Sequence, residues 1–259
     1  MTKLRVVTWN LQGSKGVDVA GVAAVLRQAT GDADIQIIGL QEVQRRQARA
    51  LARRWGAVDW RWTRKHFPYG PLLWWRAEGL AVLARHDLDQ HQVTSLTPGI
   101  HSWSYRRRIL QQVVVDAAGP RIWVFNTHLA SHGDRDARAA QAAIVAGRIA
   151  GLRPESAHDH EILVGDLNAP DEPGTLAPFT AIGLYDAWPL VGHGPGYSNP
   201  SGAPDQRLDY VLAGASLAAT AAIVAPGATT VTWAMLSDHL PVVATLRIAD
   251  EPLNESDET

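Results

Sequence analysis

The sequence of 259 residues contains no cysteine and no apolar run long enough to cross a bilayer. Without cysteine, no disulfide can hold the fold together, although export is not excluded by that alone. A membrane-spanning helix needs about 18 or more consecutive apolar residues, so none is expected. The first ten residues, MTKLRVVTWN, lack the apolar region of a signal peptide. We therefore expect a cytoplasmic protein without a membrane span, and a monomer is favoured.

A strong charge of either sign is also missing. The chain has 24 Lys and Arg residues against 26 Asp and Glu residues, which gives a net charge of −2 and a pI near 6.5. A protein that holds a phosphate backbone over a long footprint is usually basic on at least one face. The overall charge therefore gives no support for extended duplex binding, but it leaves room for a local basic patch.

The composition that is present is globular. Apolar residues make up 46% of the chain and charged residues 19%, which is enough to build a substantial core. We expect one domain over residues 1–249 and an acidic, disordered tail over residues 250–259. Gly192–Pro204 is rich in Gly, Pro and Ser, but chemically informative residues lie on both sides of it. It is interpreted as a loop inserted in one domain.

Apolar patterning indicates a mixture of strands and helices. Ala118-Gly119-Pro120 lies between two apolar runs and predicts a hairpin. The order of elements favours two layers of largely antiparallel strands with helices outside. Strands are predicted at Leu4–Trp9, Ile35–Leu40, Leu80–Leu83, Ile109–Val115, Ile122–Phe125, Glu161–Val164, Leu208–Leu212 and Pro241–Ile248, and helices at Val17–Gln28, Gln44–Trp55 and Asp134–Leu152.

Polar residues recur where these apolar strands end or begin. Strand ends at one rim of a sandwich converge, so such residues can form one pocket although they are far apart in the sequence. Carboxylate and amide oxygens are hard ligands that suit Mg²⁺. Imidazole and amide groups suit a phosphoryl group, whose transfer depends on positioning and charge stabilisation. The pattern occurs at Trp9-Asn10, Gln41-Glu42, Asn126-Thr127-His128, Gly165–Asn168, Arg207–Tyr210 and Ser237-Asp238-His239.

Seven short motifs in this order resemble the endonuclease/exonuclease/phosphatase superfamily. That group includes abasic-site endonucleases, DNase I-like nucleases, neutral sphingomyelinases and inositol-polyphosphate phosphatases. The resemblance implies a DNase I-like four-layer α/β sandwich and a phosphoesterase that depends on Mg²⁺ or Mn²⁺. The motifs are WN at Trp9-Asn10, QE at Gln41-Glu42, GLAVL at Gly79–Leu83, NTHL at Asn126–Leu129, GDLN at Gly165–Asn168, RLDY at Arg207–Tyr210 and SDHLPV at Ser237–Val242.

The resemblance also implies a role for each matched residue on the metal side. Glu42 would bind the metal directly, with Asn10 beside it, and Asp238 would complete this side. Asp166 would orient or deprotonate the attacking water, in an in-line attack on phosphorus.

On the phosphate side, the resemblance implies four further roles. Asn168 would hold a phosphate oxygen, and His239 would touch the scissile phosphate. Asp209 would fix the tautomer of His239 through a hydrogen bond. His128 matches a histidine of the nuclease and phosphodiesterase branches, where it steadies the phosphate or assists the leaving group. Near this rim, Tyr105, Arg108 and Asn126 are the predicted substrate contacts.

The substrate class stays open between two branches. Abasic-site endonucleases carry an acid two residues after the WN asparagine, where this chain has Gln12. Gln12 and the balanced charge favour a small phosphorylated molecule or a phospholipid. His128 and the segment Arg53–Arg76 favour a nucleic acid. That segment interleaves tryptophans with basic residues, which could stack on bases and pair with phosphates, or seat at a lipid interface.

Each feature also has a structural explanation. Trp60 and Trp62 could pack one strand face while the arginines are solvated, and Glu42 could simply begin a helix. The contrasting function is a non-catalytic binding protein that keeps the fold. Such a protein would be expected to lack at least one of the matched polar residues, and none is missing. Four histidines without a motif are expected on the surface or in loops: His132, His158, His160 and His193.

Overall fold

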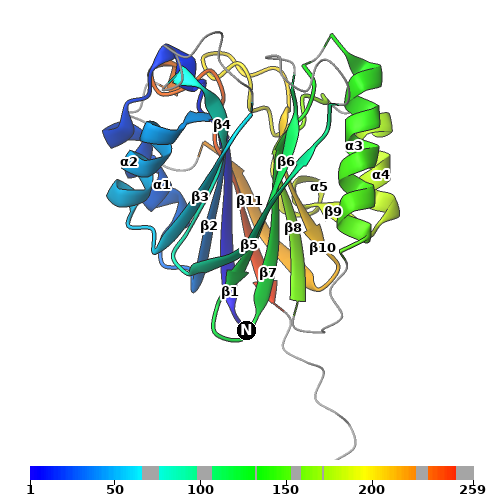
Figure 1. Ribbon diagram of the computed structural model, residues 1–259, viewed down its shortest axis with the longest axis horizontal. Helices are drawn as coiled ribbons and strands as arrows, with labels where there is room; N and C mark the ends of the chain where they lie inside the picture. Colours follow the sequence, from blue (N-terminus) through cyan, green and yellow to red (C-terminus); the bar gives the residue numbers. More distant parts are fainter. Residues whose placement is uncertain are drawn as a thin grey trace, which may run out of the picture.

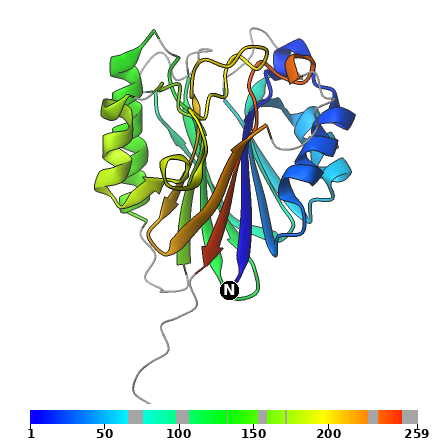
Figure 2. The ribbon, with the colours of Figure 1, turned by 180° about the vertical axis from the view of Figure 1, so that it is seen from behind.

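The computed structural model describes residues 1–65, 76–97, 107–131, 133–152, 159–170, 172–225 and 233–248. In these residues, two six-stranded sheets pack face to face, with helices on both outer faces (Figures 1 and 2). Among the described pairs, β1–β2 and β7–β8 are parallel and the others are antiparallel. The predicted four-layer α/β sandwich is confirmed. None of the described helices is long and apolar enough to cross a membrane.

Each sheet has its own pair of larger helices. The first sheet is ordered β11 (Leu217–Val224), β12 (Val242–Ile248), β1 (Lys3–Asn10), β2 (Ile35–Gln44), β4 (Glu78–Ala84) and β3 (Asp59–Arg64). The second is ordered β5 (Asp87–Ser95), β6 (Ile109–Asp116), β7 (Arg121–His128), β8 (Asp159–Asp166), β10 (Asp209–Gly214) and β9 (Leu184–Asp186). The helices are α1 (Val19–Thr30), α2 (Arg45–Trp55), α3 (Arg135–Ala150), α4 (Pro173–Ala181) and α5 (Ala187–Val191).

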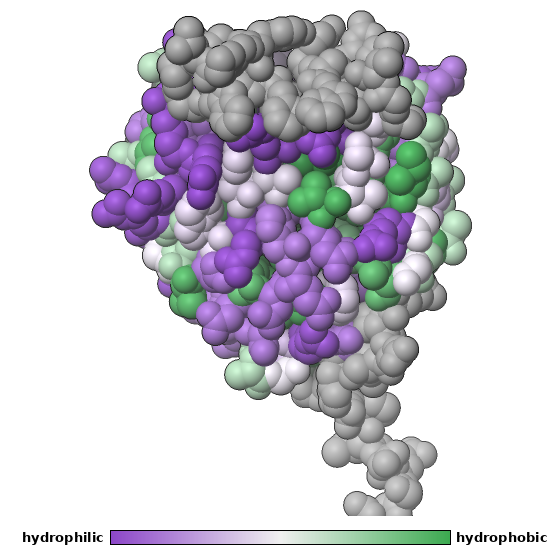
Figure 3. Space-filling model, viewed as in Figure 1, coloured by the Kyte–Doolittle hydropathy of each residue, from purple (hydrophilic) through white to green (hydrophobic). Residues whose placement is uncertain are grey.

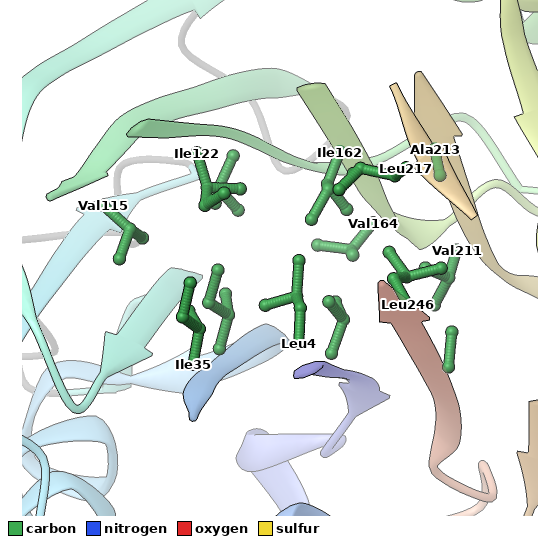
Figure 4. Close-up of a cluster of buried hydrophobic side chains, with 14 of the residues drawn as sticks. Leu4, Ile35, Val115, Ile122, Ile162, Val164, Val211, Ala213, Leu217 and Leu246 are labelled. Carbon is green, nitrogen blue, oxygen red and sulfur yellow. The ribbon is translucent and has the colours of Figure 1, made fainter. Parts of the chain in front are cut away.

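Strand alternation divides the apolar residues between three cores. In β1, Leu4 and Val6 face the second sheet, and Val7 and Trp9 face α1 and α2. This follows from the two-residue period of a strand, and it explains why β1 is buried on both faces. Figure 4 shows the central core between the sheets, where Leu4 lies among side chains from both layers.

The helices cover the outer faces with one apolar side. Asp18 begins α1 by accepting hydrogen bonds from the backbone N–H groups of Ala20 and Gly21. In α3, the predicted buried positions Val145 and Ile149 lie in the outer core of the second sheet. Because these positions are four residues apart, they lie on one face of the helix.

β5 forms an exposed edge that the sequence did not reveal as a strand. Its side chains are mostly polar and exposed, among them Asp87, Asp89 and His91. Figure 3 shows hydrophilic side chains over the middle of this face of the molecule. Charged and polar residues on an edge strand discourage pairing with another chain. The pattern gave no apolar alternation, so no strand was predicted there.

Most predicted elements are confirmed, including the hairpin that joins β6 and β7. The expectation that His160 lies on the surface is wrong. β8 begins at Asp159, earlier than predicted, and this places His160 in the sheet with 4% of its surface exposed. Its Nδ1 atom lies 2.8 Å from Ser216 Oγ. Tyr105, His132, His158 and the tail over residues 250–259 lie outside the described residues.

Candidate active site

Polar residues gather at the rim where several strands end or begin. β1, β2, β7 and β8 end at this rim, and β10 begins there. The register pairs Asp166 at the end of β8 with His128 on one side and Asp209 on the other. The predicted convergence of strand ends is therefore present in the structure.

A chain of three side chains forms the centre of the rim. His239 Nδ1 lies 2.7 Å from Asp209 Oδ2, and His239 Nε2 lies 3.8 Å from Asp166 Oδ2. Ser198 Oγ also donates to Asp209 Oδ2 at 2.7 Å. The side chains of Asp166, Asp209 and His239 are all buried. The short contact to Asp209 fixes the orientation of the imidazole, so that its second nitrogen faces Asp166.

His128 lies between two carboxylates. Its Nε2 atom is 3.5 Å from Asp166 Oδ2, and its Nδ1 atom is 3.6 Å from Glu42 Oε1. The side chain is buried, and Nδ1 has no hydrogen-bond partner among the described residues. A buried polar atom without a partner is uncommon and points to a group that a ligand completes.

Asp166 is held by the backbone and by amide side chains. Asn10 Nδ2 donates to Asp166 Oδ2 at 2.9 Å, and the backbone N–H of Asn168 donates to Asp166 Oδ1 at 3.0 Å. The Asn168 side chain in turn donates to the carbonyl of Leu129 at 3.2 Å. Asn10 and Asn168 therefore orient the Asp166 carboxylate in addition to any contact with a ligand.

At the rim, several residues other than glycine have a positive φ, a backbone conformation that they rarely adopt. Gln12, Glu42 and Asn168 have φ values of 45°, 51° and 51°. Such a conformation costs of order 1–3 kcal/mol for a residue other than glycine, and residues that adopt it cluster at functional sites. Gly165 has a φ of 155°, and a Cβ there would lie 2.1 Å from the carbonyl oxygen of Thr127. Only glycine allows β7 and β8 to bring His128 and Asp166 side by side.

The segment before β10 closes the other side of the rim. The carbonyl of Asp238 accepts hydrogen bonds from Ser201 N at 2.7 Å and from Asn199 Nδ2 at 3.1 Å. Ser237 Oγ donates to the carbonyl of Asn10 at 2.5 Å. The Asp238 side chain is half-buried. These contacts make the Gly192–Pro204 loop part of the site wall.

Two cations face the carboxylates. Lys65 Nζ lies 3.6 Å from Glu42 Oε1, and Lys65 is 5% exposed. Burial and the neighbouring Arg108 lower the pKa of Lys65 to about 8, against the opposing charges of Glu42 and Glu78. Arg108 Nη1 is buried without a hydrogen-bond partner among the described residues. Burial lowers the pKa of Arg108, and the charges of Glu42 and Asp166 oppose this.

Sequence reasoning singled out Arg108 but missed Lys65 as a site residue. The available signal is alternation on β3, where Arg61 and Thr63 point toward the second sheet. Arg61 Nη2 donates to the carbonyl of Leu88 at 2.7 Å, and Thr63 Oγ1 lies 2.8 Å from His91 Nε2. Lys65 follows in the same phase and reaches Glu42.

The environment sets the protonation of the central residues. Burial raises the pKa of Asp166 to about 6, and the charge of Asp209 adds to this effect while His239 opposes it. Burial alone would lower the pKa of His239, but Asp209 and Asp166 outweigh it and raise the value to about 10. Burial, with Lys65 and Arg108 nearby, lowers the pKa of His128 well below its ordinary value.

The donor set fits a divalent cation. Asp166, Asp209 and His239 each offer a ligand atom, and these atoms lie within 4.8 Å of one another. Asp209 Oδ2 is already bonded to His239 and Ser198, so this trio is better suited to proton transfer than to coordination. Glu42 is more accessible, with 22% of its side chain exposed. Oxygen ligands from Glu42, Asn10 and Asp238 are the type that Mg²⁺ prefers.

Asn126 does not reach the rim. It is completely buried, and its Nδ2 atom donates to the carbonyls of Leu40 at 3.2 Å and Ala81 at 3.0 Å. Gln41 Nε2 donates to its Oδ1 atom at 2.9 Å. The side chain ties the two sheets together, so the structure does not fit the predicted substrate contact at Asn126. The predicted contact at Tyr105 falls outside the described residues.

A hollow of about 360 Å³ lies beside Asp238, one of the predicted metal ligands. Gln12, Lys15, Ser201 and Asp238 contribute polar groups to its wall, and Leu11 and Met235 contribute apolar surface. Gln12 N also donates to Asn10 Oδ1 at 3.1 Å, which connects this wall to the centre of the site. The hollow is large enough for a small organic group next to the carboxylates.

Solved structures share this architecture. A mannosyl-6-phosphatase from Bacteroides thetaiotaomicron is 18% identical, with a TM-score of 0.74 over 95% of this chain and 100% of that one. The catalytic domain of human Nocturnin, with a bound sulfate, is 21% identical, with a TM-score of 0.70 over 95% of each chain. An endonuclease/exonuclease/phosphatase from Beutenbergia cavernae is 25% identical, with a TM-score of 0.69 over 98% of this chain and 73% of that one.

A comparison with curated proteins gave no match. The family model of the Endonuclease/Exonuclease/phosphatase family matches residues 7–239, from β1 to the rim histidine His239. This range holds every strand end that contributes to the rim. The chain therefore belongs to the Endonuclease/Exonuclease/phosphatase family.

Proposed function

We propose that this protein is a divalent-metal-dependent phosphoesterase that cleaves a P–O bond with an activated water. One observation carries the proposal. The side chains of Asp209, His239 and Asp166 lie in a row at one rim, and His128 lies between Asp166 and Glu42. The family membership and the phosphatase among the similar structures support hydrolysis of phosphate esters. A non-catalytic protein would have no need to keep these buried charges together.

Asp166 is the group best suited to accept a proton from water. Its pKa of about 6 lies near neutral pH, where a general base is most effective. Asn10 and the backbone N–H of Asn168 hold its two oxygens in place. The carboxylate is therefore oriented before substrate arrives, which removes a positioning cost from the reaction.

His239 supplies positive charge to the phosphoryl group. With a pKa of about 10 it carries a proton on both nitrogens at neutral pH. Nδ1 donates to Asp209, and Nε2 is left to donate to a phosphate oxygen. A fixed donor aimed at developing negative charge stabilises the transition state.

The remaining residues set the charge around the phosphate. His128 is neutral at neutral pH, so it acts as a hydrogen-bond partner and not as a cation. Lys65 and Arg108 bring the positive charge that offsets a phosphate dianion or diester near Glu42. Glu42, Asn10 and Asp238 would hold the metal ion, which supplies Lewis-acid polarisation of a phosphate oxygen when bound.

Hydrolysis of bis(p-nitrophenyl) phosphate and p-nitrophenyl phosphate tests the proposal. The purified protein should release nitrophenolate with Mg²⁺ or Mn²⁺ and lose this activity in EDTA. A faster diester reaction would indicate the phosphodiesterase type, and a faster monoester reaction the phosphatase type. Full activity in EDTA, or no activity with either ester and either metal, would contradict it.

A further inference from the structure

A second concave surface lies outside the catalytic rim, between α2 and the edge strand β3. Its hollow has a volume of about 1000 Å³, larger than the one beside Asp238. We call it the α2–β3 groove. It is lined by Arg45, Arg46, Arg49, Ala50, Arg53, Trp60, Trp62, Arg64 and Ala77.

The groove is strongly basic in a protein that is not. Five arginines line it, and none of its described lining residues is acidic. The whole chain has a net charge of −2, so this concentration of positive charge is local. Figure 3 shows strongly hydrophilic side chains on the side of the molecule where Figure 1 places α2. The charge predicts an anionic ligand.

The arginines of α2 form a stripe along the groove. Arg45, Arg49 and Arg53 are exposed and follow one another at intervals of four residues, so they lie on one face of the helix. At about 1.5 Å per residue, the stripe spans roughly 12 Å. A single compact phosphate needs its cations gathered at one point. A stripe of this length fits an anion that repeats along a chain.

Two tryptophans form part of the opposite wall. Trp60 and Trp62 alternate along β3 on the same face, and both are half-buried against the core under α1 and α2. Trp62 Nε1 donates to the carbonyl of Val43 at 2.8 Å, which fixes its ring. The exposed parts of such rings, beside arginines, are suited to stacking against flat aromatic groups. A repeating anion that carries flat groups is a nucleic-acid strand.

The same features argue against a lipid surface. Interfacial tryptophans and arginines lie on a convex face that enters the headgroup layer. Here the tryptophans lie inside a hollow, and the Trp62 indole N–H is already engaged with the protein. A bilayer is too flat to follow the groove.

Two of the residues that line the groove are close in sequence to residues of the rim. Arg45 follows the rim residue Glu42 by three positions, and Arg64 is the neighbour of Lys65, which contacts Glu42. A strand in the groove would therefore lead toward Asp166. We propose that the α2–β3 groove binds a single-stranded nucleic-acid segment and presents the continuing strand to the catalytic rim. The second half of this statement rests on the proposed function, and the binding itself does not.

Fluorescence anisotropy with labelled oligothymidylate and oligouridylate, each of about 12 nucleotides, tests the groove directly. EDTA is present throughout, so that binding is measured without hydrolysis. The wild-type protein should bind at low ionic strength and weaken as salt rises. Arg49→Gln/Arg53→Gln should raise the Kd about tenfold and reduce the salt slope by about 1.4, because each lost phosphate contact removes about 0.7.

Arg54→Gln/Arg247→Gln is the matched control. It removes the same charge from exposed residues that do not line the groove, and Arg54 lies on the same helix. Its Kd should stay within about twofold of wild type. Trp60→Leu keeps the apolar packing but removes the stacking ring, and should weaken binding at least about fivefold. Thermal unfolding of each variant establishes that it is folded.

Three outcomes would overturn the proposal. They are no oligonucleotide binding by the wild-type protein, equal losses in the groove and control variants, and binding to phosphatidylglycerol vesicles in place of oligonucleotides. Hydrolysis of bis(p-nitrophenyl) phosphate by the wild-type protein is scored separately. A protein that binds oligonucleotides through Arg49 and Arg53 but hydrolyses no ester keeps the groove and loses the proposed function.

Discussion

Arg138 and Glu172 are buried, like the charges of the proposed catalytic rim, but their charges and hydrogen bonds are satisfied in a different way. Arg138 is completely buried, and its Nη2 atom lies 2.6 Å from Glu172 Oε2. Its Nη1 atom donates to the carbonyls of Ala130 and Ser131 at 3.3 and 2.8 Å. The hydrogen-bonding capacity of the pair is filled from within the protein. This is the arrangement of a buried ion pair that holds a loop to a helix.

The rim leaves part of its capacity unfilled. His128 Nδ1 and Asp209 Oδ1 are buried and have no hydrogen-bond partner among the described residues. Burial raises the pKa of Asp166, so its charge is not fully compensated by its neighbours. At Glu172, burial acts to raise the pKa, but the hydrogen bond and charge of Arg138 outweigh it and hold the value low. In these two regions, the uncompensated buried charge lies in the candidate site, whereas the matched charge lies in a structural ion pair.

The largest expected difference between the two groups is in catalysis. Asp166→Ala and His239→Ala should each lower kcat by roughly a thousandfold or more, because they remove the proposed proton acceptor and the proposed hydrogen-bond donor to the phosphate. The structural pair serves as the control, since Glu172→Gln should keep kcat within about threefold at a temperature where it is folded. Steady-state kinetics on the nitrophenyl ester that reacts faster give kcat for the wild type and for each of the three variants. Comparable losses of kcat in all three variants would contradict the distinction between the rim and the structural ion pair.

For stability, we expect the larger loss from a substitution in the Arg138–Glu172 pair and not from one in the rim. Glu172→Gln leaves the Arg138 guanidinium buried without a counter-ion, and should lower the free energy of unfolding by about 3 kcal/mol. Urea unfolding at neutral pH measures this. Arg135→Gln is the milder comparison, because Arg135 reaches the same carboxylate at 3.4 Å but is largely exposed. Its effect should stay below about 1 kcal/mol. Equal effects would show that the burial of Arg138 is not what matters.

Neutralising the rim should have the opposite sign. In metal-free protein, Asp166→Asn removes an incompletely compensated buried charge and should raise the free energy of unfolding by about 1 kcal/mol. Adding Mg²⁺ should raise the melting temperature of the wild-type protein more than that of Asp166→Asn, by linkage between binding and folding. If metal-free Asp166→Asn is less stable than the wild type, the protein already compensates the charge of Asp166.

The sequence predicted those parts of the fold that follow from periodicity. Runs such as Leu4–Trp9 and Ile109–Val115 are apolar enough to be recognised as strands. β5 is polar because it is an edge, β11 is rich in alanine, and α4 contains Pro173 and Pro178. In each of these three, tertiary contacts outweigh local preference, so the sequence pattern alone did not reveal them.

The candidate site divides in the same manner. The rim residues at strand ends were predicted as a group because their motifs occur in order along the sequence. Lys65 was not, since it reaches Glu42 only through the phase of β3 and the packing of an edge strand. Asn126, which precedes His128 by two residues in one motif, was predicted as a substrate contact. Both lie on the same face of β7, but Asn126 sits deeper, where it bridges the sheets.

The smallest expected effect is a difference in pH dependence, measured on metal-free protein by urea unfolding between pH 7 and pH 4. The pKa of Glu172 is held below its ordinary value of 4.5, so its contribution is present above its unfolded pKa and is lost as pH falls through the folded value. The stability gap between wild type and Glu172→Gln should therefore stay constant down to about pH 5 and shrink only below it.

Asp166 has the opposite sign. Its folded pKa of about 6 lies above the unfolded value, so the folded protein binds a proton that the unfolded chain does not hold at pH 5. The ionised Asp166 carboxylate therefore lowers the free energy of unfolding above about pH 6. This destabilisation disappears as pH falls toward about 4. The advantage of Asp166→Asn over wild type should shrink over that interval, while the gap for Glu172→Gln stays unchanged until lower pH. Parallel pH profiles for the two variants would mean that both carboxylates are equally compensated, and the contrast between a structural pair and an unfilled site would no longer hold.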